Sequence, residues 1–131
     1  MILKRLCEGG ARFAALALAG AVAGCAWPTS DESTLKAIAA ECQHLMRTEP
    51  PDADAGPVPA YHGVPESRWP QIIASLKPTG VAVFRQGCDV QTKPMLDGGW
   101  GYFVPRSKGS LPQPRDRYSD LGYGVYWYRP Y

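Results

Sequence analysis

The chain has 131 residues, a length that accommodates one small domain. Its formal net charge is +2, from 14 Lys and Arg against 12 Asp and Glu. Three of the bases and one acid (Lys4, Arg5, Arg12 and Glu8) fall within the first 24 residues, so eleven of each charge remain beyond them. This even balance excludes a general electrostatic affinity for nucleic acid.

The first 24 residues have the layout of an export signal. The basic residues Lys4, Arg5 and Arg12 precede an apolar run over 13–23. A positive start followed by about ten apolar residues is typical of a secretory signal peptide. The run is shorter than the roughly 20 residues that a permanent membrane-spanning helix needs. We therefore expect residues 1–24 to be removed.

Four residues at the end of the apolar run carry a further signal. Val22-Ala23-Gly24-Cys25 resembles the lipobox of bacterial lipoproteins. The resemblance covers only this region, and it implies cleavage before Cys25 and acylation of that cysteine. Ala26 follows, and in lipoproteins of the enterobacterial type the absence of aspartate at that position implies transfer to the outer membrane, facing the periplasm.

Ordinary secretion is the alternative for this segment. Ala21-Val22-Ala23 also fits a conventional cleavage site, which would release a soluble product beginning at Gly24. The number of cysteines disfavours ordinary secretion. The secreted product would keep three thiols, Cys25, Cys42 and Cys88, which is an odd number in an oxidising compartment. Acylation of Cys25 leaves a pair.

Beyond the anchor, residues 25–29 form a lipidated tether and residues 30–131 one domain. Thr29 and Glu32 have the spacing of a capping box. Apolar residues at helical spacing then predict a helix over 30–47, which ends before the Glu49-Pro50-Pro51 sequence. Residues 49–65 are rich in proline and acid, which predicts an extended surface connection.

A second helix and several strands follow. Ser67 is the expected N-cap of a shorter helix, with Pro70 in its first turn and Pro78 closing it. Strands are expected at 81–85, 90–93, 100–104 and 122–128, with a turn or bulge at 86–89 and a loop at 105–120. The pattern predicts an α+β fold with two N-terminal helices packed on an antiparallel sheet of three or four strands.

Two cysteines remain in the mature domain. Cys42 lies on the apolar stripe of the first helix, and Cys88 is expected at a turn between strands. Given export, we expect a disulfide between them, which would be worth on the order of 4 kcal/mol. The alternative is two buried free thiols, which are ordinary core residues. We expect no metal site, since Cys42 and His44 do not face each other on a helix.

No catalytic arrangement stands out. A Cys88–His62 nucleophile, oriented by Asp89 or Asp120, would be abolished by the disulfide. The chain has enough carboxylates to supply the pair that glycoside hydrolysis needs (Glu66, Asp89, Asp97, Asp116 and Asp120). Their better interpretation is as residues that favour turns. The sequence predicts no cofactor.

Aromatic residues crowd the last third of the chain. Alternation on strands places Trp100, Tyr102 and Val104 on one face and Phe103 on the other. One set forms the core, and the second is expected to face solvent, where it could bind a sugar or a protein. With the basic loop over 105–117, this gives a possible binding face, comprising Phe103, Arg106, Lys108, Tyr126 and Tyr128. Cross-strand stiffening and a simply solvated loop are the alternatives.

These observations lead to one functional hypothesis and two alternatives. The hypothesis is a non-enzymatic lipoprotein of the cell envelope, held at the membrane by its lipid and contacting a protein or glycan partner. An inhibitor or immunity lipoprotein directed against a periplasmic toxin or hydrolase is a narrower form of it. A small cell-wall hydrolase is the enzymatic alternative, and a purely structural component of the envelope is the other.

Overall fold

The computed structural model describes residues 27–51, 63–96 and 98–130. Cys25, His62, the export segment and most of the 49–65 connection lie outside these residues, so the predictions that concern them stay predictions. Within the described part, the elements in chain order are α3 (Glu32–Thr48), a 3-10 turn (Glu66–Arg68), α4 (Gln71–Ser75), β1 (Gly80–Val83), β2 (Gly87–Lys93), β3 (Trp100–Pro105), a second 3-10 turn (Arg115–Arg117), β4 (Tyr118–Gly122) and β5 (Val125–Tyr128).

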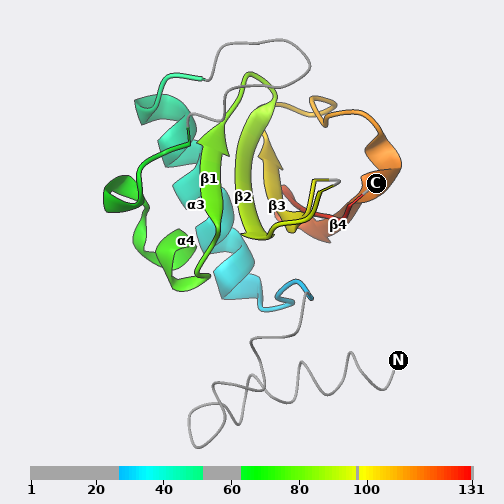
Figure 1. Ribbon diagram of the computed structural model, residues 1–131, viewed down its shortest axis with the longest axis horizontal. Helices are drawn as coiled ribbons and strands as arrows, with labels where there is room; N and C mark the ends of the chain where they lie inside the picture. The colour runs from blue at the N-terminus through cyan, green and yellow to red at the C-terminus, as the bar shows by residue number, and fades with distance from the viewer. Residues whose placement is uncertain (1–26, 52–62, 97, 131) are drawn as a thin grey trace, which may run out of the picture.

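The strands form one antiparallel sheet in the order β1-β2-β3-β5-β4. The α3 helix packs across one face of this sheet, and α4 lies beside α3 (Figure 1). The α+β class is therefore confirmed. The sheet has five strands in place of three or four, and α4 lies in the middle of the chain, so the expectation of two N-terminal helices was wrong.

The first helix follows its sequence pattern closely. The expected span of 30–47 is observed as 32–48, and the apolar stripe is buried as Leu35, Ile38, Cys42, Leu45 and Met46. The N-cap is Asp31, whose carboxylate accepts a hydrogen bond from the Thr34 amide at 2.9 Å. The expected capping box from Thr29 was wrong, because the Thr29 hydroxyl accepts a hydrogen bond from the Asp31 amide instead.

The second helix is a single turn. Pro70 is its N-cap, and Ser67 lies in the preceding 3-10 turn, so the expected Ser67 cap was wrong. A carboxylate from the neighbouring helix takes over this role: the two Glu41 oxygens accept hydrogen bonds from the Ile72 and Ile73 amides, each at 2.8 Å. Glu41 thereby satisfies donors that a helix start leaves free and ties α4 to α3.

The core lies between α3, α4 and the sheet face that they cover, which we call the inner face. Its sheet residues are Val81, Val83, Cys88, Val90, Tyr102, Val104 and Val125. Register places the alternate residues on the opposite, outer face, where Asp89 neighbours both Ala82 and Phe103. The predicted alternation in β3 is thus confirmed. Among the described residues, no helix has the length and apolar character that crossing a bilayer requires.

Candidate functional site

A carboxyl held among aromatic rings lies on the outer face of the sheet. Asp89 was expected at a turn or bulge, but it lies within β2, because the strand begins at Gly87. The Tyr128 hydroxyl donates a 2.6 Å hydrogen bond to Asp89 Oδ1 across the intervening strand β3. Burial raises the pKa of Asp89 to about 6, although the hydrogen bond from Tyr128 and the positive charge of Arg117 act to lower it.

Two glycines make room for the rings that surround this carboxyl. Tyr128 crosses Gly101, where an added Cβ would lie 2.6 Å from the phenol oxygen. Phe103 crosses Gly87 in the same way, with its ring carbon Cζ 2.8 Å from the position of such a Cβ. Only glycine permits this close approach, so Gly87 and Gly101 position the rings on the outer face.

A cation completes the arrangement. The Arg117 guanidinium carbon lies 5.4 Å from the centre of the Tyr128 ring and 5.7 Å from that of Tyr118. Its Nε donates to the Arg129 carbonyl at 2.9 Å, which fixes the side chain between the end of β5 and the second 3-10 turn. Tyr118 in turn packs edge-on against Phe103, with ring centres 5.7 Å apart.

We call these five residues (Asp89, Phe103, Arg117, Tyr118 and Tyr128) the Asp89 cluster. A carboxyl whose pKa is near 6 can both donate and accept a proton close to neutral pH. Of the surrounding groups, Tyr118 and Arg117 are partly exposed and could contact a polar ligand, whereas the Phe103 and Tyr128 rings are buried. Asp89 is partly exposed as a residue, although its carboxyl is enclosed enough for burial to raise its pKa.

Sequence reasoning missed Asp89 as the centre of this cluster. It identified Phe103 and Tyr128 as members of a solvent-facing set, and both do lie on the outer face. However, they are 3% and 4% exposed, so the expectation that they face solvent was wrong. Tyr126 is partly exposed on the same face. The alternation of Cys88, Asp89 and Val90 is the signal that could have placed Asp89 in a strand.

Arg106, another residue of the expected binding face, contacts the protein itself. Its guanidinium donates to the carbonyls of Arg85, Met46 and Phe84 at 3.1, 3.4 and 3.0 Å. These contacts join the β1–β2 turn to the C-terminal end of α3, where a cation is favourable. Lys108 is exposed in the loop after β3. The two basic residues therefore have different surroundings, and Lys108 is the one of the two that is open to a partner.

The two cysteines lie together in the core. Cys42 and Cys88 are fully buried free thiols on α3 and β2, in hydrogen-bond contact with each other. Cys88 lies inside β2, so the expected turn position was wrong. Burial raises the pKa of Cys42 well above its ordinary value, and the contact with Cys88 raises it further. A buried thiol of this kind is a poor nucleophile, and the expected Cys42–Cys88 bridge stays a prediction.

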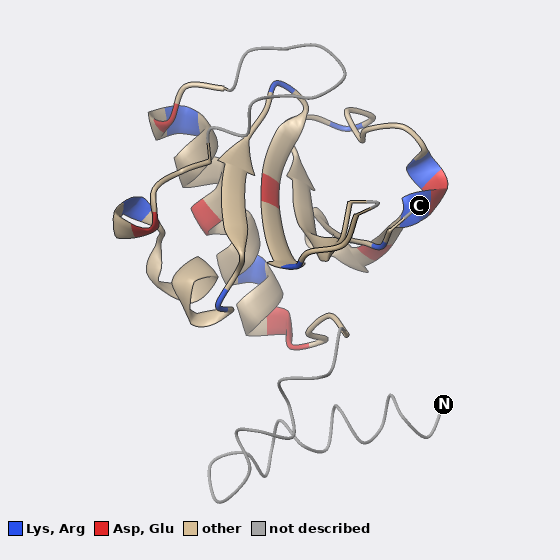
Figure 2. Cartoon of the chain, viewed as in Figure 1, with Lys and Arg blue, Asp and Glu red and all other residues tan. Residues whose placement is uncertain are grey.

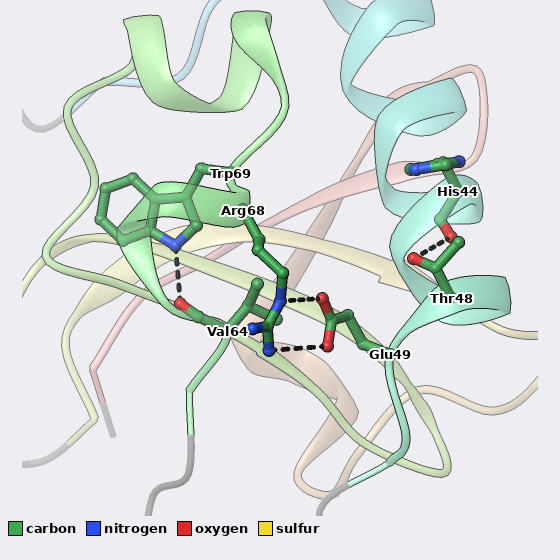
Figure 3. Close-up of polar contacts among 6 residues, drawn as sticks. All are labelled: His44, Thr48, Glu49, Val64, Arg68 and Trp69. Carbon is green, nitrogen blue, oxygen red and sulfur yellow. Dashed lines mark hydrogen bonds and ion pairs between the residues drawn. The ribbon is translucent and has the colours of Figure 1, made fainter.

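One acidic residue at the end of α3, Glu49, is paired with a basic residue. Arg68 forms a two-pronged ion pair with Glu49, at 2.7 and 3.2 Å, and Trp69 donates to the Val64 carbonyl at 2.8 Å (Figure 3). His44 is exposed on α3, and its carbonyl accepts a hydrogen bond from the Thr48 hydroxyl at 3.0 Å. The Arg68–Glu49 pair joins the 63–70 segment to the end of α3.

Within the described ranges, no three His, Cys, Asp or Glu side chains gather as metal ligands would. No protein-family model matches the chain, and neither a curated protein nor a solved structure matches it significantly. Function is therefore inferred from the residues and their geometry.

Proposed function

We propose that this chain is a lipid-anchored protein of the bacterial cell envelope, whose domain binds a protein or glycan partner from the periplasmic side of the outer membrane. The observation that carries the proposal is the sequence Val22-Ala23-Gly24-Cys25 at the end of an apolar run. The fold is compatible with a short anchor, because the Thr29 amide already donates to the Tyr102 hydroxyl at 2.8 Å.

Metabolic labelling with a clickable fatty acid tests the anchor. The wild-type chain and Cys7→Ser should both become labelled, because Cys7 lies in the part that is removed. Cys25→Ser should lose the label entirely. Equal labelling of Cys25→Ser, or an unlabelled wild-type protein, would contradict lipidation at Cys25.

The outer face of the sheet is the surface we propose for the partner. Support comes from Asp89, Arg117 and the partly exposed Tyr126, which place acid, base and aromatic groups on one face of a rigid sheet. Polar and aromatic groups held on a rigid support are suited to recognition.

A photo-reactive amino acid at position 126, compared with one at the exposed Gln43 on α3, tests this surface in living cells. We expect crosslinked protein adducts, or cosedimentation with cell-wall sacculi that Tyr126→Ala weakens, and no adduct from position 43. Equal crosslinking from both positions would contradict the choice of face.

One observation favours the enzymatic alternative. A carboxyl with a pKa of about 6 has the protonation behaviour of a general acid, and Asp89 is such a group. If the protein releases fragments from purified peptidoglycan, Asp89→Asn should abolish that activity, and Asp120→Asn, at an exposed position of β4, should retain it. That result would replace the binding function with a hydrolytic one.

A further inference from the structure

The domain has two distinct ends. At one, Arg106 joins the C-terminal end of α3 to the β1–β2 turn, and Arg68 pairs with Glu49; we call this the distal end. The opposite end carries the start of α3, the α4–β1 turn and the β2–β3 turn (Figure 1). We call it the tether end, because the chain enters the fold there, at Trp27.

Three of the large apolar side chains that are exposed in the described residues, Trp27, Met95 and Leu96, lie at the tether end. Trp27 and Tyr123 are 51% and 49% exposed, and Met95 and Leu96 are 52% and 105% exposed. Trp27 precedes α3, and Met95 and Leu96 lie in the β2–β3 turn. Tyr123 contacts Lys36 in the second turn of α3, with 5.2 Å from Nζ to the ring centre. The fourth, Tyr123, lies in the β4–β5 turn, which the strand register puts at the opposite end of the sheet from the β2–β3 turn. Scattered exposed apolar residues are ordinary, but three of them at one end of a small domain are not.

Lysines accompany these residues. Lys36 lies beside Tyr123, and Lys93 lies 5.2 Å from the ring centre of Trp100. Figure 2 shows basic positions on the first turns of α3, at the end of β2 and at the α4–β1 turn, where Lys77 is located. Asp31 and Glu32 are also at this end, and Glu32 is paired with Lys36 at 2.6 Å. Long lysine side chains beside exposed aromatic rings are typical of proteins at a membrane–water boundary.

The length of the tether decides which surface this end meets. Four residue steps separate Cys25 from Thr29, and each spans at most about 3.5 Å, so an acylated Cys25 lies within ~14 Å of Thr29. We infer that the tether end lies on the lipid headgroups, with Trp27, Met95 and Leu96 entering the interface. The inference rests on the proposed lipid anchor for the source of the membrane. It leaves the distal end and the outer face of the sheet open to the periplasm.

Quenching of tryptophan fluorescence by brominated lipids tests whether the tether end contacts the membrane. The mature protein is reconstituted into vesicles of phosphatidylethanolamine and phosphatidylglycerol with brominated acyl chains. We expect quenching of the wild-type fluorescence and loss of most of that quenching in Trp27→Phe. Trp69→Phe is the matched control, because Trp69 lies with the Arg68–Glu49 pair near the distal end; its removal should leave the quenching unchanged.

Flotation of the same vesicles separates the two proposals. If the native protein does not float, the lipid anchor is wrong, and the membrane contact is then tested on the soluble product by coupling its Cys25 thiol to a maleimide lipid. In either preparation, equal quenching of the wild type and of Trp27→Phe would overturn the proposed contact between the tether end and the membrane. A second result would also overturn the membrane contact: Trp27 fluorescence that neither the brominated lipids nor dissolved acrylamide quenches. A protein partner or a second copy of the chain would then cover this end.

Discussion

The inner and outer faces of the sheet are stabilised by different means. On the inner face, aliphatic side chains of α3 pack against valines of β1, β2 and β3, so the contacts are apolar and insensitive to pH. On the outer face, aromatic rings lie across glycines around one carboxyl whose pKa is about 6. The inner face is therefore an apolar core, whereas the outer face combines buried aromatic rings with an ionisable carboxyl.

The largest effect should come from the thiol pair of the inner face. In the exported protein we expect Cys42 and Cys88 to be bridged, and reduction of this bridge should lower the free energy of unfolding by about 4 kcal/mol, because it releases a long loop in the unfolded chain. Urea unfolding with and without reductant measures the difference. The Cys42→Ala/Cys88→Ala variant should show no dependence on reductant, and two free thiols in the exported protein would refute the bridge.

Truncation of the inner face comes next. Ile38→Ala removes a fully buried side chain from α3 and should lower the free energy of unfolding by about 3 to 4 kcal/mol. The loss should be the same at about pH 4 and about pH 7, since no ionisable group is involved. Gln43→Ala, on the exposed side of the same helix, should change it by less than about 0.5 kcal/mol. A strong pH dependence of the Ile38→Ala loss would contradict the division between faces.

The outer face should make stability depend on pH through Asp89. Its pKa is about 6 in the folded protein and near 3.8 when unfolded, so the folded state binds more protons between these values. The free energy of unfolding should therefore fall as pH rises from about 4 to about 6, by up to about 3 kcal/mol.

The Asp89→Asn variant should lose this component of the pH dependence and be at least as stable as the wild type at about pH 7, because the substituted amide carries no charge to bury. Denaturation curves at several pH values measure both quantities. Asp120→Asn, at an exposed position of β4, should retain the wild-type slope. If the free energy of unfolding of Asp89→Asn changed with pH as steeply as that of the wild type, the Asp89 carboxyl would not be the source of the pH dependence.

A smaller effect is expected where a ring crosses a glycine. Gly101→Ala places a methyl group against the Val90 carbonyl oxygen and the Tyr128 phenol, and should cost about 2 kcal/mol through overpacking. Tyr128→Phe keeps the ring and removes only the hydroxyl that donates to Asp89, so it should cost about 1 kcal/mol. Thermal unfolding ranks the two variants. A larger loss in Tyr128→Phe than in Gly101→Ala would contradict the steric explanation.

The sequence predicts the local elements better than it predicts the site. Apolar periodicity locates α3 to within two residues, and alternation in β3 assigns Tyr102 and Phe103 to opposite faces. Strand β4, in contrast, was assigned to the loop at 105–120. It is an edge strand that pairs with β5 alone, and none of its residues is fully buried, so it carries no clear hydrophobic pattern.

The Asp89 cluster could not be assembled from the sequence because its contacts are distant along the chain. Asp89 and Tyr128 are 39 positions apart, and they meet only through the strand order β2-β3-β5. Arg106 is a similar case: its cationic side chain suggested a ligand site, but it binds backbone carbonyls on α3 and the β1–β2 turn that only the folded chain brings together.

The central claim is a lipid-anchored domain with a disulfide in its core. The most direct test is the intact mass of the mature protein after extraction from membranes with detergent. We predict a polypeptide that begins at Cys25, carries the added mass of acyl chains, and lacks the two hydrogens of the Cys42 and Cys88 thiols. A water-soluble product that begins at Gly24, with every cysteine unmodified, would contradict it.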